Sequence, residues 1–211
     1  ADRSLPALLI LRLIFSMRHF LLWLCCVLAL TACEKPQSPK VPFANTDITG
    51  LDYAKGFTLT DHNGKPRTLA DFKGKVVVVF FGYTQCPDVC PTTLSELAGI
   101  KKALGSEAER LQVIFITLDP QRDTPELMAG FVPAFDSSFL GLWGEQAVID
   151  KVAKDFKVFA QKVPSKDSKS YTIDHTAASY VFDTRGHLRL FVRHGQNGAP
   201  LLNDLKLLLS E

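Results

Sequence analysis

The sequence predicts an α/β domain in which helices cover both faces of a mixed β-sheet. Short apolar runs that fit buried strands alternate with segments of helical periodicity through the middle of the chain, which predicts parallel strands joined by helices. Near the end, two strand-like runs flank a tight turn, and an amphipathic segment follows them. An antiparallel hairpin therefore joins the parallel strands, and the sheet is mixed.

The expected elements begin with a hairpin, in which an Asn-Gly turn at 63–64 separates two short strands, 57–60 and one around Thr68. The unbroken apolar run at 76–81 predicts a buried strand. A helix starts after Thr124, because threonine is a favoured N-cap and proline and an acid follow it. This order gives a thioredoxin-like arrangement with an added N-terminal β-hairpin. The further strands expected are 111–118, 140–143, an edge segment at 158–163, 178–182 and 187–192, and the further helices are 91–104, 145–156 and 200–209.

The first 32 residues predict a secretory signal peptide of the lipoprotein type. A basic start at 17–19 precedes an apolar core at 20–30 that is short for a membrane span. The sequence Leu-Thr-Ala-Cys at 30–33 resembles the lipobox of bacterial lipoproteins, which implies that Cys33 is lipidated. The alternative is an uncleaved anchor that recruits the apolar stretch 8–15, and residues 1–16 fit an upstream extension from a misassigned start.

Residues 33–50 predict a linker that tethers the domain to the membrane, because Pro, Lys, Ser and Gln dominate them. The remaining residues, 51–211, are enough for one hydrophobic core. Three of the 24 Lys and Arg residues and one of the 22 Asp and Glu residues lie in the first 32 positions, so 21 of each remain and their formal charges cancel. We expect no nucleic-acid partner, since a basic surface is missing.

Two cysteines, Cys86 and Cys90, follow the strand at 76–81 and precede a predicted helix. Pro91 suits the first helical position, so we expect Cys90 at the N-cap and Cys86 on the preceding loop. Helix amides near both sulfurs favour the thiolate, which is both the nucleophile and the metal ligand. The pair suits a disulfide or a soft metal, whereas a purely structural bridge across so small a loop would stabilise the fold little.

Three motifs occur in order along the domain: FGYTQCPDVCPTTL at 81–94, TLDPQRDTPE at 117–126 and DHT at 174–176. Together they resemble the Sco/SenC family of copper-binding cytochrome c oxidase assembly factors. The resemblance implies a membrane-anchored thioredoxin-like protein that binds copper through Cys86, Cys90 and His175. It also implies that Asp119, in the second motif, is a nearby acidic group and not a ligand.

The sequence around His175 does not by itself indicate a metal ligand, because a histidine in a Ser/Lys-rich stretch is more often a solvated loop residue. His175 can be a ligand only if the fold brings it close to the cysteines. It precedes the strand at 178–182, and a thioredoxin-like fold brings that loop opposite the cysteine turn. Such folds usually carry a cis-proline about there, and Ala177 in its place argues against a general oxidoreductase. Asp174 is the candidate to orient the imidazole. We expect the other histidines to be surface or structural residues, namely His62, His187 and His194.

The donor set suits copper, since thiolates bind Cu(I) well and an added imidazole is acceptable to Cu(II). Zinc would accept the same three ligands. The resemblance implies a copper chaperone, not an enzyme, held in the bacterial cell envelope with its domain on the periplasmic side. Its expected partners are a copper-accepting cytochrome oxidase subunit, a thiol reductant protein and the membrane, through the lipid anchor.

Other functions remain open from the residues. A thiol-disulfide reductase would use Cys86 and Cys90 as a redox pair, keep a partner's copper-site cysteines reduced and not require His175. A copper sensor would use metal binding to change partner contacts. A peroxidase is disfavoured, because peroxiredoxins carry a threonine three residues before the reactive cysteine, where this chain has Pro87 and Tyr83.

Overall fold

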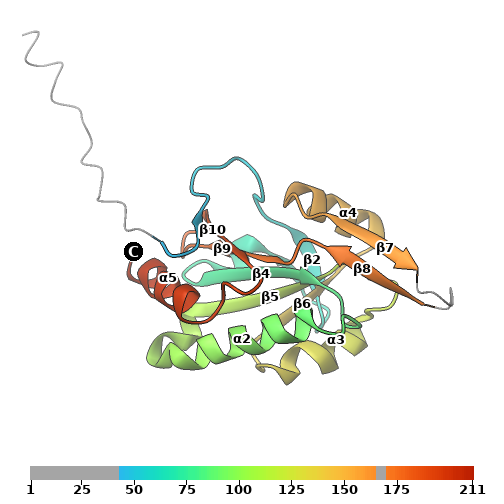
Figure 1. Ribbon diagram of the computed structural model, residues 1–211, viewed down its shortest axis with the longest axis horizontal. Coiled ribbons are helices and arrows are strands. Elements are labelled where there is room, and N and C mark those ends of the chain that lie inside the picture. The colour runs from blue at the N-terminus through green and yellow to red at the C-terminus, as the bar shows by residue number, and fades with distance from the viewer. Residues whose placement is uncertain (1–42, 165–169) are drawn as a thin grey trace, which may run out of the picture. The chain divides into compact units, whose positions relative to one another are not determined.

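An eight-stranded mixed sheet forms the centre of the domain, in the strand order β1-β10-β9-β4-β5-β6-β2-β3. The computed structural model describes residues 43–164 and 170–211 (Figure 1). Strands β4, β5 and β6 pair in parallel, and the other neighbours pair antiparallel. The strands of this sheet are β1 (Thr46–Asp47), β2 (Thr58–Asp61), β3 (Pro66–Thr68), β4 (Val76–Gly82), β5 (Leu111–Thr117), β6 (Leu140–Trp143), β9 (Ala178–Phe182) and β10 (Leu188–Arg193).

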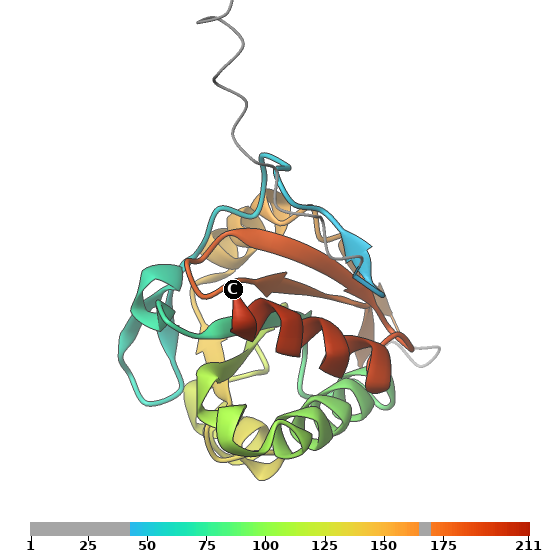
Figure 2. The same ribbon diagram turned by 90° about the vertical axis from the view of Figure 1, so that its left-hand side faces the viewer.

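Helices lie on both faces of the sheet, as the layers in Figure 2 show. On one face, α2 (Val89–Ala103), α3 (Pro125–Phe131) and α5 (Ala199–Ser210) contribute to a single apolar cluster. On the other face, α4 (Gln146–Asp155) packs on a second cluster. The short 3-10 segments are η1 (Leu69–Phe72), η2 (Gly105–Arg110) and η3 (Val132–Ala134).

The central strand β4 explains why both faces need cover. Successive side chains of a strand point to opposite faces, and all seven residues of β4 are buried. Val76, Val78 and Phe80 belong to the α2 and α5 cluster, whereas Val77, Val79 and Phe81 belong to the α4 cluster. The predicted thioredoxin-like sheet with helices on both faces and an N-terminal β-hairpin is confirmed, and the hairpin β2-β3 extends the sheet beyond β6.

Two predictions about the region before β9 were wrong. The segment expected at the sheet edge forms β7 (Ala160–Pro164), which pairs with β8 (Tyr171–His175) in a separate two-stranded sheet. His175, expected in a loop, is the last residue of β8. The polar composition of this hairpin hid it, because all five residues of β7 are exposed and only Ile173 of β8 is buried.

Described residues within the segment expected to be a linker contact the domain. Strand β1 pairs with β10 at the sheet edge. The carboxylate of Asp204 on α5 accepts hydrogen bonds from the backbone N–H groups of Ala44 (2.8 Å) and Asn45 (2.9 Å) and from the Asn45 side chain (2.8 Å). Asp204 is buried, so these bonds fix the start of the domain against α5.

Candidate metal centre

The two cysteines lie where β4 passes into α2, but not as the sequence predicted. Helix α2 begins at Val89 with Asp88 as its N-cap, so Cys90 lies within the first turn and not at the N-cap. Pro91 is tolerated there because the amides of the first turn have no partner within the helix. Cys90 is fully buried and Cys86 is half-buried, and neither forms a disulfide.

Gly82, the last residue of β4, leaves the space that the Cys90 sulfur fills. A Cβ atom at this position would lie 2.7 Å from Cys90 Sγ and 2.9 Å from Cε2 of Phe115. Atoms of a real side chain do not approach that closely, so the buried sulfur depends on the missing side chain. In the sequence Gly82 directly follows the predicted strand 76–81, and only the packing shows why a glycine is needed there.

The two thiols differ in acidity. The hydrogen bond from the Cys90 side chain is the main cause that lowers the pKa of Cys86 to about 5, and the backbone N–H groups of Asp88 and Cys90 assist it. The same hydrogen bond, together with burial, raises the pKa of Cys90. The expectation that helix amides favour the thiolate therefore holds for Cys86, which accepts these bonds, and not for Cys90.

Asp123 holds the loop between β4 and α2 in place through hydrogen bonds. Its buried carboxylate accepts hydrogen bonds from the Thr84 backbone N–H (3.0 Å), the Thr84 hydroxyl (2.5 Å) and the Thr117 hydroxyl (2.7 Å). Burial raises the pKa of this carboxyl, while the hydrogen bonds oppose the shift. Asp123 lies just before the start of α3, and its hydrogen bonds to Thr84 fix the conformation of the residues just before Cys86.

His175 reaches the cysteines from the β8–β9 junction. Its Nε2 lies 3.8 Å from Cys90 Sγ. The imidazole packs edge-on against the rings of Phe80, at a centroid distance of 6.3 Å, and Tyr83, at 6.1 Å. These rings shield one side of the imidazole and restrict its rotation.

Asp174 does not orient the imidazole, contrary to our expectation. The neighbour of His175 Nδ1 is the carbonyl oxygen of Thr176, at 3.1 Å. Asp174 is exposed, because adjacent residues of a strand point to opposite faces. A carbonyl that accepts from Nδ1–H leaves Nε2 as the nitrogen with a free lone pair toward Cys90.

Asp119 contacts the β7–β8 hairpin, through Tyr171. Its buried carboxylate pairs with Arg122 and accepts a hydrogen bond from the Tyr171 hydroxyl at 2.8 Å. The side chain of Arg122 also contacts Gln85 in the cysteine loop. Sequence reasoning singled out Asp119 but missed Arg122, Gln85 and Tyr171, since only the fold brings these three segments together.

The donor atoms suit a soft metal ion. Metal–sulfur and metal–nitrogen bonds of about 2.3 and 2.0 Å, as for zinc, place two ligands of a tetrahedral ion about 3.5 Å apart. The 3.8 Å between Cys90 Sγ and His175 Nε2 is close to that separation. Within residues 43–164 and 170–211, however, no group of three or more His, Cys, Asp or Glu side chains is arranged to hold a metal ion. Of the three expected ligands, Cys90 contacts both of the others, Cys86 and His175.

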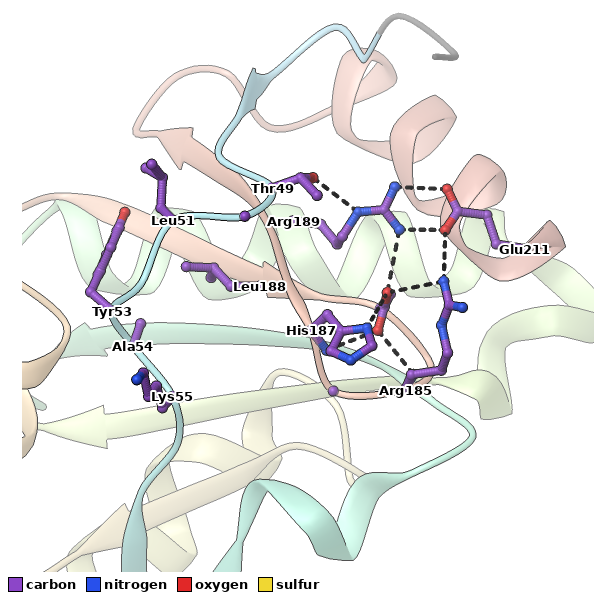
Figure 3. A pocket seen from close by; sticks show the side chains of 13 residues that line it. Thr49, Leu51, Tyr53, Ala54, Lys55, Arg185, His187, Leu188, Arg189 and Glu211 are labelled. Carbon is purple, nitrogen blue, oxygen red and sulfur yellow. Dashed lines mark hydrogen bonds and ion pairs between the residues drawn. The ribbon is translucent and has the colours of Figure 1, made fainter. Parts of the chain in front are cut away.

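A cavity of about 650 Å³ lies elsewhere, between the loop at 49–55 and the β9–β10 turn (Figure 3). Its charged side chains neutralise one another: Arg189 pairs with Asp183 at 3.3 Å and also with Glu211. His187 lies 3.5 Å from Asp183. These contacts organise the β9–β10 turn and lie apart from the cysteine loop.

The remaining histidines have structural surroundings, as expected. Nδ1 of His62 accepts a hydrogen bond from the Gly141 backbone N–H at 3.0 Å, and burial lowers the pKa of this imidazole. His194 is exposed and lies beside the Thr93 hydroxyl, at 3.4 Å. Cys33 and the predicted signal peptide lie outside the described residues. In the part of the chain that is described, no helix has the length and apolar character needed to cross a membrane.

Comparison with known proteins places this geometry in a family. The family model described as SCO1/SenC matches residues 46–210. The mitochondrial SCO2 homologue of Mus musculus is 36% identical over 152 residues, which cover 71% of this chain. That match covers 60% of the mouse protein, so the chain spans less than two thirds of this relative's length.

Solved structures show the same fold. ScoI of Bradyrhizobium japonicum with copper bound is 43% identical, with a TM-score of 0.66, and the match covers 72% of this chain and 96% of that one. A SCO1/SenC family lipoprotein from Bacillus anthracis is 26% identical, with a TM-score of 0.63, and the match covers 79% of this chain and 98% of that one. The first of these proteins holds copper, and the second is described as a lipoprotein.

Proposed function

This chain belongs to the SCO1/SenC family, and we propose that it is a membrane-anchored copper chaperone for the copper centre of cytochrome c oxidase. Copper is its cargo, and Cys86, Cys90 and His175 are its ligands. The observation that carries the proposal is the approach of His175 Nε2 to Cys90 Sγ, at 3.8 Å, beside a second thiol.

Copper fits these donors better than a harder metal. Two thiolates and one imidazole suit Cu(I), and the imidazole also accepts Cu(II). Binding requires that Cys90 lose its proton, which its raised pKa opposes in the free protein. A bound copper ion would take the place of the hydrogen bond between the two sulfurs. Its positive charge would offset the negative charge of the Cys90 thiolate.

Delivery requires that the cargo leave by ligand exchange. Cys86 is half-buried and Cys90 is fully buried, so an incoming thiolate of the acceptor meets the Cys86 side first. Three ligands also leave a position free for the acceptor's donor atom, since a closed four-ligand cage would hold the ion. The acceptor in this proposal is a cytochrome oxidase subunit, and a thiol reductant protein keeps the cysteines reduced.

The proposed location is the bacterial cell envelope, with the domain on the periplasmic side. The Leu-Thr-Ala-Cys sequence at 30–33 supports lipidation of Cys33, and the B. anthracis relative is described as a lipoprotein. Membrane binding that is lost in Cys33→Ala, with the domain still folded, would support this anchor. Membrane binding that persists in this variant favours the uncleaved apolar segment instead.

Copper titration of the reduced protein tests the proposal. We expect one copper ion per chain in the wild type, and loss of stoichiometric Cu(II) binding in both His175→Ala and Cys86→Ser. His62→Ala is the matched control, because this histidine contacts Gly141 and lies away from the sulfurs. Undiminished copper affinity in His175→Ala would remove the imidazole from the ligand set and with it the chaperone proposal.

The alternative is a thiol-disulfide reductase that maintains reduced cysteines in a copper-site partner. The opposite pKa shifts of the two cysteines favour it, because the half-buried, low-pKa Cys86 thiol can attack and the buried Cys90 thiol can resolve the mixed disulfide. Reduction of a disulfide peptide by the His175→Ala variant at the wild-type rate, together with loss in Cys86→Ser, would support this function.

A further inference from the structure

Arg122 joins the two segments that carry the proposed copper ligands. One segment is the cysteine loop, which leads from β4 into α2, and the other is β8, which ends at His175. The Nη1 group of Arg122 donates to the side-chain oxygen of Gln85, at 3.1 Å, and to the backbone carbonyl oxygen of Tyr171, at 3.0 Å. A single guanidinium therefore contacts both the residue before Cys86 and the first residue of β8.

The Arg122 guanidinium is held in place by an ion pair with Asp119 and by the aromatic ring of Tyr171. Its Nε donates to Asp119, whose side chain is fully buried, while the Arg122 side chain is 19% exposed. The Tyr171 ring lies under the guanidinium carbon, at 3.7 Å, and the hydroxyl of this tyrosine donates to Asp119 at 2.8 Å. Arg122, Tyr171 and Asp119 thus form a closed set of contacts, which we call the Arg122 clamp. An ion pair shielded in this way keeps its geometry better than an exposed pair.

Strand β8 depends on such contacts because it is not part of the main sheet. Among the described strands, it pairs only with β7. The chain rejoins the main sheet at Ala178, in β9, which follows His175 closely. The contact at Tyr171 holds the opposite end of β8, and Ile173 between them is buried in the core. The direction of β8, and with it the orientation of His175, is therefore set at both ends.

We propose that Arg122 is a positioning residue for copper binding, which acts through the Arg122 clamp to hold β8 against the cysteine loop. This inference rests on the proposed function, because it concerns the same ligands. Lysine keeps the positive charge but cannot contact Gln85, Tyr171 and Asp119 from one planar group, nor stack on the ring in the same way. The fork geometry of arginine is the property that the clamp uses.

The test compares Arg122→Lys with a matched control, Arg67→Lys, in the full-length chain with its thiols reduced. Arg67 also pairs with a fully buried aspartate, Asp61, at 2.8 Å, and lies over an aromatic ring, Phe72, at 5.9 Å. It belongs to the β2–β3 hairpin and not to the cysteine loop. The control therefore reproduces the loss of a partly buried arginine fork without touching β8.

We expect Arg122→Lys to weaken Cu(II) binding by about 10- to 100-fold, the usual effect of removing a group that orients a metal ligand. We also expect a shifted thiolate-to-copper absorption band in this variant, with both properties unchanged in Arg67→Lys. Wild-type affinity and spectrum in Arg122→Lys would overturn the inference. An equal loss in Arg67→Lys would also overturn it, because the effect would then come from general destabilisation.

A second readout uses the metal-free protein. Amide hydrogen exchange across β8 should be faster in Arg122→Lys than in the wild type, and unchanged in Arg67→Lys. Wild-type exchange in Arg122→Lys would overturn the positioning role. If the wild type itself binds no copper, or binds it without His175, the chaperone proposal fails, and the exchange comparison still decides whether Arg122 holds β8.

Discussion

The Sγ atom of Cys90 lies 3.8 Å from Nε2 of His175, although 85 positions separate the two residues in the chain. Cys90 reaches this point from the first turn of α2, and His175 from the end of β8. Because β4 and β9 are neighbours in the sheet, the segments that follow β4 and precede β9 meet at one edge. The pairing of two strands therefore creates the contact between a thiol and an imidazole.

Alkylation of the metal-free protein should distinguish the two thiols. The pKa of Cys86 is lowered to about 5 and that of Cys90 is raised, so we expect one thiol per chain to react at neutral pH. The rate should fall as the pH drops through about 5, where Cys86 becomes protonated. Iodoacetamide with peptide mapping measures both. Cys90→Ala should raise the Cys86 pKa, since its main hydrogen-bond donor is gone, and two thiols that titrate together near the ordinary value of about 8.5 would contradict this prediction.

Substitution of Gly82 should disturb the buried sulfur. A methyl group in Gly82→Ala would meet Cys90 Sγ at 2.7 Å and force the sulfur or the Phe115 ring to move. Overpacking of this kind costs about 1–3 kcal/mol, and we expect weaker copper binding as well. Urea unfolding and copper titration measure the two effects. Gly99→Ala in the exposed part of α2 is the control: it meets nothing within 4 Å and should be neutral or stabilising.

Removal of the Asp123 carboxylate should loosen the cysteine loop. Asp123→Ala leaves Thr84 and Thr117 without the buried acceptor that both use, which costs about 2–4 kcal/mol. Thermal unfolding of the wild type and the variant measures this loss. Hydrogen exchange of the Thr84 amide should also become faster, and an unchanged rate would show that the loop keeps its conformation without Asp123.

The β9–β10 turn should make stability depend on pH. Burial alone would raise the pKa of Asp183, but hydrogen bonds from the backbone N–H groups of His187 and Arg185, and nearby positive charges, lower it. The unfolded chain then takes up a proton at a higher pH than the folded protein does. The contribution of Asp183 is present above its unfolded pKa of about 3.9 and is lost as the pH falls through the folded value.

Urea unfolding at neutral pH and at about pH 3 measures this dependence, since the two conditions bracket the unfolded pKa. Asp183→Asn should lower stability at neutral pH by about 2 kcal/mol and should lose less on acidification than the wild type. Asp52→Asn is the control, because this aspartate is exposed on the surface. An equal acid loss in the wild type and Asp183→Asn would exclude Asp183 as a cause.

The sequence predicted the sheet well because its buried strands have a strong local pattern. Val76–Gly82 is apolar throughout, and Thr124 with Pro125 marks the start of α3 as expected. The hairpin that carries His175 has no such pattern: β7 is exposed on both faces, so alternation of polar and apolar residues is missing. Its position depends on contacts such as Arg122 with Tyr171, which join residues 49 positions apart.

The sequence likewise predicted only some features of the candidate site. The spacing of Cys86 and Cys90 after a buried strand predicted a reactive pair, and the structure places them together. The sequence alone could not predict which thiol is acidic, because that depends on burial and on the direction of one hydrogen bond. It also favoured Asp174 as the partner of His175, since a carboxylate is visible in a sequence and the backbone carbonyl that takes this place is not.

The bonds of Asp204 to Ala44 and Asn45 determine where a force on the N-terminal side of the chain acts on the domain. That point lies beside α5, on the side of the domain away from the β7–β8 hairpin (Figure 1). A pulling force on this side of the chain would therefore break these bonds first, at the end of the domain opposite the hairpin that carries His175 (Figure 1).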